Sequence, residues 1–263
     1  MTRRYAVLAW TAAACTYLLI VLGAVVRITG SGMGCGDHWP LCNGRLFPPL
    51  DDLGTAIEWS HRLLASVVSV LVAAVALVAW RERRPGATPY VALGIVGAQV
   101  LLGGVTVKTG LTPLMVILHL ATAMVLLATL LMAAGPRREG ARSAVPLLAL
   151  AFVTILFGAL VANLGAASAC LGFPLCNGQL LPTGNYLQHL HWTHRLLAYA
   201  LTASVIVWTV RTPGRGPKAV LGLVLLQVTV GAAAVLLGLP GGLQAAHVAV
   251  GAGVWAGLVL AVR

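Results

Sequence analysis

Apolar runs of about 20 residues recur along this chain between short polar breaks, and no other feature constrains its fold as strongly. Each run is long enough to cross about 30 Å of hydrocarbon. Of the 263 residues, 59% are hydrophobic and only 9% are charged, whereas a soluble domain has roughly 25% charged residues. The composition therefore excludes a water-soluble fold and predicts a polytopic membrane protein.

The apolar runs predict an all-α membrane protein with eight transmembrane helices. Most of the breaks between the runs contain Gly, Pro or charged residues. The first run continues to Val26, which is too long for the apolar region of a signal peptide, so we expect it to be retained as a helix. No Ser/Arg-rich presequence precedes it, which favours a bacterial plasma membrane. The expected spans are residues 5–26, 59–80, 88–107, 113–134, 144–164, 189–210, 218–238 and 243–262.

Basic residues outnumber acidic residues by 17 to 6, which gives a net charge of +11. They fall in small clusters between the apolar runs and not along one face, which argues against nucleic-acid binding. With a cytoplasmic N-terminus, 12 of the 17 lie inside, so the positive-inside rule predicts cytoplasmic termini and two long extracytoplasmic loops. The inside set is Arg3, Arg4, Arg81, Arg83, Arg84, Arg137, Arg138, Arg142, Arg211, Arg215, Lys218 and Arg263, and the outside set is Arg27, Arg45, Arg62, Lys108 and Arg195.

The sequence contains an internal repeat. Residues 39–48, WPLCNGRLFP, match residues 173–182, FPLCNGQLLP, at an offset of 134. Later matches have offsets of 133 and then 128, and a few deleted loop residues explain the decrease. The chain is therefore a tandem duplication. The later matches are His61-Arg62-Leu63-Leu64-Ala65 with His194-Arg195-Leu196-Leu197-Ala198, Gln99 with Gln227, and His119 with His247.

Each half of the duplication holds four expected spans, an even number. Both halves therefore insert the same way up, and we expect a pseudo-two-fold axis along the membrane normal to relate them. The predicted architecture is two tandem four-helix bundles, an N-terminal half over residues 1–138 and a C-terminal half over residues 139–263.

Four of the five cysteines lie in the two loops expected outside, where the compartment is oxidising. Six residues separate Cys35 from Cys42 and five separate Cys170 from Cys176, spacings that suit one local disulfide in each loop. The two-residue spacing of zinc knuckles and thioredoxin-like sites is absent. Free thiols or a redox-active pair are the alternatives. Cys15, within the first span, is interpreted as a small buried apolar residue.

Every second span carries one histidine in its outer half or at its outer end: His61, His119, His194 and His247. A lone intramembrane histidine is more often a packing residue. Four of them at repeat-related positions favour a function, because ionisable groups in hydrocarbon are costly. Two imidazoles facing each other across a four-helix bundle are suited to bind a haem iron from both sides, which predicts one haem site in each half. Solvated side chains are expected for the remaining histidines, His38, His189 and His191.

The two halves differ at one ionisable position. Glu58 lies three residues before His61, about one turn away on the same helix face. The matching position before His194 is occupied by His191. Glu-x-x-His also occurs in di-iron bundles, but these need further carboxylates from other helices, and no other acidic residue is available here.

Two pairs of polar residues accompany the histidines. Arg62 and Arg195 each follow a histidine and have the planar guanidinium that suits haem propionates, whereas snorkelling to lipid headgroups is the alternative. Gln99 and Gln227 are expected to form hydrogen bonds between helices.

These motifs resemble those of the haem A synthase family of eight-span membrane proteins, and the resemblance covers essentially the whole chain. Glu58-Trp59-Ser60-His61-Arg62 is its most specific part. The cysteine pairs Cys35–Cys42 and Cys170–Cys176 match the outer-loop pairs of that family. The other matching features are Gly30-Ser31-Gly32, Trp39-Pro40-Leu41-Cys42-Asn43-Gly44, His119, His194-Arg195 and His247.

The resemblance implies that the protein oxidises a ring methyl group of haem O to a formyl group, giving haem A for terminal oxidase assembly. It also implies that Glu58 is the catalytic carboxylate and that His61 and His119 flank the substrate haem. His194 and His247 are then the ligands of a permanent haem b in the C-terminal half. Haem O synthase is the expected source of haem O, and quinol or another membrane donor is the expected source of electrons.

Two other classes of function fit parts of the pattern. A non-enzymatic dihaem b-type cytochrome that passes electrons from quinol also needs two bis-histidine sites, but Glu58 argues against pure electron transfer. A transporter built from parallel repeats is the third reading. Transporters usually have broken helices and polar groups near the midplane, whereas the polar groups here gather near the outer face.

Overall fold

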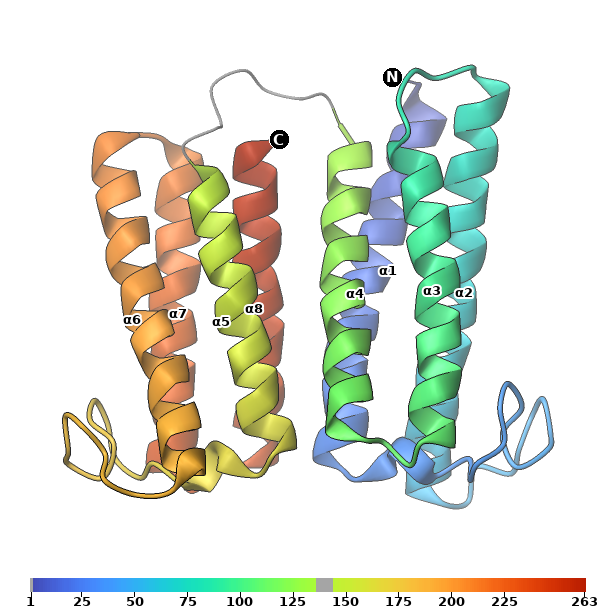
Figure 1. Ribbon diagram of the computed structural model, residues 1–263. Coiled ribbons are helices and arrows are strands. Elements are labelled where there is room, and N and C mark those ends of the chain that lie inside the picture. The colour runs from blue at the N-terminus through green and yellow to red at the C-terminus, as the bar shows by residue number, and fades with distance from the viewer. Residues whose placement is uncertain (1, 136–143) are drawn as a thin grey trace. The chain divides into compact units, whose positions relative to one another are not determined.

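The computed structural model describes residues 2–135 and 144–263. These residues form eight α-helices joined by loops, and they contain no β-strand beyond two isolated bridges (Figure 1). The predicted all-α fold class is confirmed. The expected cytoplasmic residues Arg137, Arg138 and Arg142, and the expected boundary after residue 138, lie outside the described residues.

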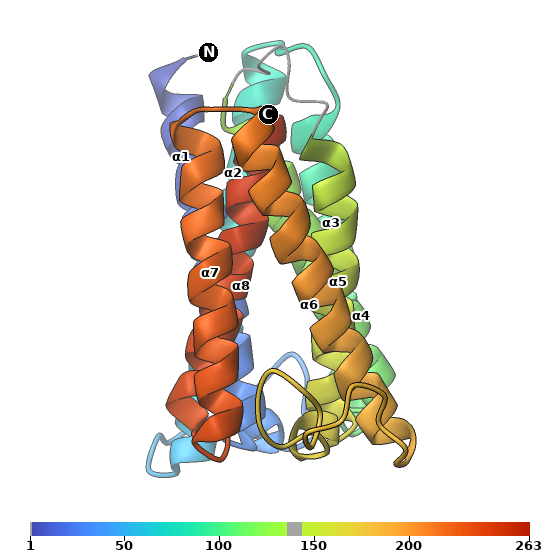
Figure 2. The ribbon, with the colours of Figure 1, turned by 90° about the vertical axis from the view of Figure 1, so that its left-hand side faces the viewer.

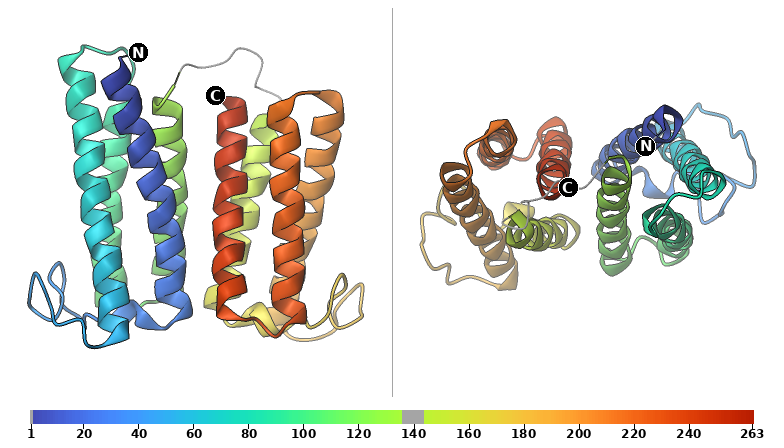
Figure 3. Two further views of the ribbon diagram at one scale, coloured as in Figure 1. Left: turned by 180° about the vertical axis from the view of Figure 1, so that it is seen from behind. Right: turned by 90° about the horizontal axis from the view of Figure 1, so that it is seen from above.

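The first compact unit spans Met1–Arg137. Each of its helices contacts two others, in the ring α1, α2, α3, α4 and back to α1, so the unit is a four-helix bundle (Figure 3). Its first helix begins at the end of the bundle opposite the long loop between α1 and α2 (Figure 1). The helices are α1 (Arg3–Ile28), α2 (Leu53–Arg81), α3 (Thr88–Lys108) and α4 (Pro113–Ala133).

The second compact unit spans Arg138–Arg263. The same ring of contacts joins its helices, from α5 through α6 and α7 to α8 and back to α5. Figure 2 shows its long loop at the end of the bundle where α6 begins. The helices are α5 (Val145–Asn163), α6 (Tyr186–Arg211), α7 (Arg215–Leu236) and α8 (Gly241–Val262). The pseudo-two-fold relation between the halves stays a prediction.

Seven of the described helices are long and apolar enough to cross a membrane. The remaining helix, α6, has 26 residues but carries five amide or ionisable side chains in its first turns. Residues 196–210 of α6 are predominantly apolar, and the helix completes the ring of the second bundle. The five residues are Gln188, His189, His191, His194 and Arg195.

Helix α2 begins six residues before the expected span, at Leu53. Asp52 is its N-cap and accepts a hydrogen bond from the Thr55 backbone N–H at 2.7 Å. Likewise α6 begins at Tyr186 with Asn185 as N-cap. An apolar run marks the thickness of the hydrocarbon, whereas a capping residue marks the end of the helix, so the two differ where a helix extends beyond the bilayer core.

Small apolar residues fill the interior of the first bundle. Helix α1 buries Ala9, Ala12 and Ala13, and α2 buries Val68 and Val72. Such residues let helix backbones approach closely, which is how helices associate in lipid. Many large apolar side chains are exposed on the outer surface of the bundles, as expected for helices that face hydrocarbon.

Candidate functional site

A disulfide closes each cysteine loop, as the spacing predicted. Cys35 is bonded to Cys42 and Cys170 to Cys176, with Cα–Cα distances of 4.4 and 4.6 Å, and all four residues are buried. In both loops the second cysteine exchanges two backbone hydrogen bonds with the residue three positions later. The sequence repeat is therefore also a repeat of loop conformation.

Arg62 and Arg195 fasten the cysteine loops to their helices. Nη1 of Arg62 donates to the carbonyl oxygens of His38 at 2.7 Å and Leu41 at 2.8 Å. Nη1 of Arg195 donates to the repeat-related carbonyl oxygens of the second loop, those of Gly172 at 2.9 Å and Leu175 at 2.8 Å. These bonds give both guanidinium groups a structural role in the loops, and their contact with haem propionates stays a prediction.

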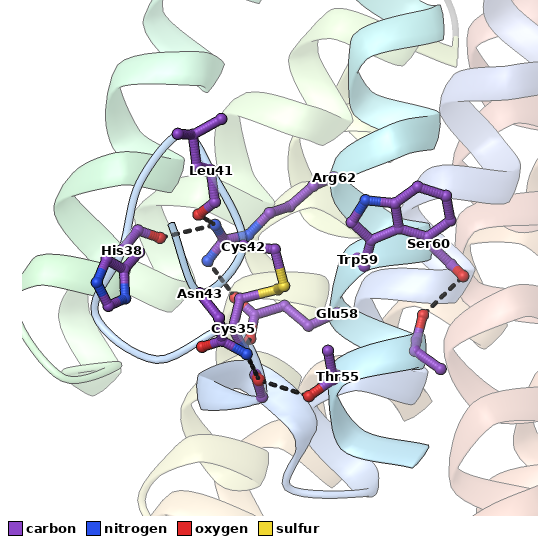
Figure 4. Close-up of a disulfide and its surroundings, with 12 residues drawn as sticks. Cys35, His38, Leu41, Cys42, Asn43, Thr55, Glu58, Trp59, Ser60 and Arg62 are labelled. Carbon is purple, nitrogen blue, oxygen red and sulfur yellow. Dashed lines mark hydrogen bonds and ion pairs between the residues drawn. A yellow bond between two sulfur atoms is a disulfide. The ribbon is translucent and has the colours of Figure 1, made fainter. Parts of the chain in front are cut away.

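Glu58 lies beneath the first cysteine loop and is only 3% exposed. Its Oε2 accepts a hydrogen bond from the backbone N–H of Cys35 at 2.7 Å, and its Oε1 accepts one from Nη2 of Arg62 at 2.5 Å (Figure 4). A buried carboxylate is costly unless it is paired and hydrogen-bonded, and both conditions are met here. The carboxylate thus connects α2 to the disulfide loop.

His191 occupies the position of Glu58 in the second unit and is 5% exposed. The expectation that its side chain is solvated is therefore wrong. Its Nδ1 lies 3.0 Å from the carbonyl oxygen of Ala166, in the short 3₁₀-helix that follows α5. A position in the first turns of a helix suggested solvent, but the loop folds over this part of α6. His38 and His189 are exposed, as predicted.

The four span histidines form one pair in each unit. His61 on α2 and His119 on α4 belong to the first, and His194 on α6 and His247 on α8 belong to the second. The rings of each pair lie close enough to interact electrostatically. Nδ1 is buried without a hydrogen-bond partner among the described residues in all of them except His194. A buried polar atom without a partner requires an explanation, and ligand binding is one.

Hydrogen bonds hold the histidines of the second unit. Nδ1 of His194 lies 3.1 Å from the carbonyl oxygen of Thr154 on α5. Nε2 of His247 lies 3.2 Å from the amide nitrogen of Gln227 on α7, so the interhelical contact expected for this glutamine is confirmed. In the first unit the amide oxygen of Gln99 is buried and has no partner among the described residues.

The chain matches the model of the COX15-CtaA family, described as cytochrome oxidase assembly protein, over residues 6–56 and 52–259. The chain belongs to this family. The matched residues include both cysteine loops, Glu58 and the four span histidines. The resemblance found in the sequence motifs is confirmed.

Three relatives of this COX15-CtaA family member are named heme A synthase. The protein from Shouchella clausii is 36% identical over 218 residues, which cover 74% of this chain and 72% of the relative. The protein from Bacillus licheniformis is 33% identical over 260 residues, covering 87% and 85%. The protein from Alkalihalophilus pseudofirmus is 32% identical over 218 residues, covering 75% and 73%.

Sequence reasoning missed the contacts that tie the site to the loops. The pair Glu58 and Arg62 has the four-residue spacing of helical ion pairs, so this contact had a readable signal. The peptide groups of Cys35 and Ala166 that complete the network had none, because every residue carries the same backbone donor and acceptor.

Proposed function

We propose that this protein is a haem A synthase, an oxidoreductase that converts haem O to haem A by oxidising a ring methyl group to a formyl group for terminal oxidase assembly. Membership of the COX15-CtaA family and relatives named heme A synthase support this proposal. The observation that carries it is the difference between the units: a buried carboxylate, Glu58, lies one turn from His61, while His191 takes its place beside His194.

The residues present fit haem groups. The Nδ1 atoms of His61, His119 and His247 are buried and have no partner among the described residues, and a bound group would account for them. Imidazole is a common axial ligand of haem iron, and facing helices of a bundle supply such ligands. In our proposal His61 and His119 flank the substrate haem O, and His194 and His247 hold haem b. When bound, haem b supplies a centre that takes up and releases one electron.

Glu58 is the proposed catalytic residue. Arg62 and the N–H of Cys35 fix both of its carboxylate oxygens, so the side chain is held in one orientation before substrate arrives. A negative group held in this way can stabilise positive charge that develops at the methyl carbon and can accept a proton released there. His191 is less suited to stabilise a cation, so the chemistry is assigned to the N-terminal half.

The proposed setting is a bacterial plasma membrane with both termini cytoplasmic and both cysteine loops outside. The uneven distribution of basic residues supports this orientation. Cysteines introduced at Leu46, an exposed position of the first loop, and at Arg84, at the other end of α2, test it directly. We expect an impermeant reagent to label position 46 and not position 84 in whole cells, and the opposite result overturns the topology.

The delivery of haem O by haem O synthase and the supply of electrons by quinol or another membrane donor complete the proposal. Haem analysis of the purified protein tests it against the alternatives. Haem b together with haem O or haem A supports the synthase. Haem b alone supports a dihaem cytochrome, and a protein without haem supports a transporter.

A further inference from the structure

Each span histidine lies against a glycine of a neighbouring helix in its own bundle. The glycines follow the repeat of the histidines, because the first and third helices of each bundle carry one each. A Cβ atom added to any of them would contact the Cε1 atom of an imidazole ring. The distances are 3.2 Å from Gly23 to His61, 3.5 Å from Gly103 to His119, 2.9 Å from Gly158 to His194 and 2.8 Å from Gly231 to His247.

The two units differ in how closely the imidazole rings pack against these glycines. At Gly158 and Gly231 the added Cβ would lie under 3.0 Å from the ring, a separation that real Cβ atoms essentially never show. At Gly103 the distance is an ordinary van der Waals contact, and at Gly23 the ring of His61 must give by a few tenths of an ångström. The atom that the added Cβ would meet belongs to the imidazole ring, so the ring or the helix must shift when the contact is too short.

Each span histidine of the second unit also has one hydrogen bond to its ring. His194 contacts the carbonyl of Thr154 through Nδ1, and His247 contacts the amide of Gln227 through Nε2. The Nδ1 atoms of His61 and His119 have no partner among the described residues, and neither has Nδ1 of His247. A hydrogen bond to the ring nitrogen that does not bind the metal fixes the orientation of a metal-binding histidine. The bond from Nδ1 of His194 to the Thr154 carbonyl is of this kind, and it leaves Nε2 to bind iron.

We propose that Gly158 and Gly231 are positioning residues, which hold the imidazoles of His194 and His247 in the orientation that binds haem b. Their repeat mates leave the histidines of the first unit freer to move. This inference rests on the proposed function, in which haem b stays bound and the substrate haem must enter and leave. Closely packed histidines suit haem b, which stays bound, and less closely packed histidines suit the substrate haem, which is exchanged.

Alanine substitutions in the full-length, haem-loaded protein test the inference. Gly158→Ala and Gly231→Ala are expected to lower the haem b content several-fold, or to change the low-spin signal in electron paramagnetic resonance spectra. Gly103→Ala is expected to retain the wild-type haem content. Gly222→Ala on α7 and Gly97→Ala on α3 are the controls, because no atom lies within 4 Å of a Cβ at either position. Alanine favours helix over glycine, so the controls should fold normally.

A double substitution keeps the test informative if Gly231→Ala folds poorly. Replacing His247 with Ala removes the ring that the new Cβ contacts, so Gly231→Ala combined with His247→Ala should recover helical content and monodisperse behaviour. The double variant should also lose no more haem b than His247→Ala alone, because the glycine acts through the histidine. An additional loss of haem in the double variant, or no recovery of folding, contradicts a positioning role.

Two further results separate the inference from the proposed function. If His194→Ala and His247→Ala both keep haem b, the ligand assignment itself is wrong, whatever the glycine variants do. If these variants lose haem b while Gly158→Ala and Gly231→Ala keep wild-type content and spectra, only the positioning role is overturned. Equal losses in Gly231→Ala and the Gly222→Ala control also overturn it.

Discussion

The two units hold their cysteine loops in the same way but use different residues beneath them. In the first, Glu58 accepts the backbone N–H of Cys35 at 2.7 Å. In the second, Nη2 of Arg195 donates to the carbonyl oxygen of the repeat-related Cys170 at 2.8 Å, while His191 contacts the short helix after α5. One scaffold thus supports a carboxylate in one unit and an imidazole in the other, while both units keep the disulfide and the arginine bonds to the loop carbonyls.

The comparison separates what each element does. The disulfide, the loop and the arginine clamp occur in both units, so they serve a task that both need, which is to cover the end of the bundle where the histidines lie. The carboxylate occurs in one unit only. It therefore serves a task that only one unit performs, and oxidation of the substrate is the task that the proposed function assigns to one haem alone.

The largest expected effect is the loss of haem A formation in Glu58→Gln. Glutamine has the same shape and keeps an oxygen that can accept the Cys35 N–H, but it has no charge and is a poor proton acceptor. General acid–base groups contribute about 10²-fold or more to rates, so we expect haem A to fall by about that factor while haem O or a partly oxidised haem accumulates. Chromatography and mass spectrometry of extracted haems measure this.

Glu82→Gln on the same helix is the control for that substitution. Glu82 caps the other end of α2, where it interacts with Thr2 and Arg84, and is expected to support wild-type haem A formation. Helix-dipole stabilisation by a carboxylate is confined to the first turn, and Glu58 lies in the second turn after Asp52. Near-normal haem A formation by Glu58→Gln would favour the dihaem cytochrome instead.

The second prediction concerns which histidines hold the permanent haem. His194→Ala or His247→Ala should remove or strongly change the haem b absorbance of the purified protein, because each removes an axial ligand. His61→Ala and His119→Ala should keep haem b and lose haem O and haem A. If all four variants lose haem b equally, the assignment of haem b to the second unit is wrong. If only His61→Ala and His119→Ala lose it, haem b is bound in the first unit.

The third prediction compares the two arginine clamps. Arg195 is 6% exposed, and its hydrogen bond to Cys170 is buried, so Arg195→Gln leaves a buried carbonyl oxygen unpaired and should destabilise the protein by about 1–3 kcal/mol. Arg62→Gln removes the charged partner of the buried Glu58 carboxylate, so it should destabilise the protein at least as much, although the loop bonds of Arg62 are exposed. It should also reduce haem A formation more, because Glu58 is the proposed catalytic residue.

Thermal unfolding and haem extraction on the same preparations measure both effects. Disulfide mapping is the control, because both variants should retain both disulfides. If Arg195→Gln impairs haem A formation as much as Arg62→Gln at equal stability, the arginines act only as loop clamps, and Arg62 has no separate task toward Glu58.

Sequence patterns predicted most of this fold because the membrane simplifies the problem. Apolar runs located the spans, and the short cysteine spacings in loops expected outside the membrane predicted both disulfides. The start of α2 was missed by six residues, because Asp52 caps the helix outside the apolar run. Hydropathy reports where lipid is, and it carries no information on how far a helix continues into water.

The site was less predictable than the fold. The burial of His191 depends on a loop that crosses the start of α6, a long-range contact that no local pattern reports. The partner of Glu58 in the loop is a peptide N–H, which any residue at position 35 except proline would supply. The close contact between His247 and Gly231 depends on how α7 and α8 are aligned along their axes, and only the packing of the helices determines this alignment.

The smallest expected effect concerns the N-caps of α2 and α6, which lie at repeat-related positions and differ in charge. The backbone N–H of Thr55, and then its hydroxyl, holds the pKa of Asp52 below its ordinary value. A carboxyl group with a lower pKa in the folded state stabilises the fold above its unfolded pKa, and this contribution is lost as the pH falls through the folded pKa. Asn185 caps α6 with an amide oxygen that does not titrate.

Asp52→Asn should therefore change the stability of the protein little at neutral pH. In acid the variant should lose less stability than the wild type, because both caps are then amides that do not titrate. Asn185→Asp should do the reverse and make the second unit more sensitive to acid. Melting temperatures between about pH 3 and pH 7, on either side of the ordinary pKa of Asp, measure both effects. Identical acid profiles for wild type and Asp52→Asn would show that the charge at this cap contributes nothing.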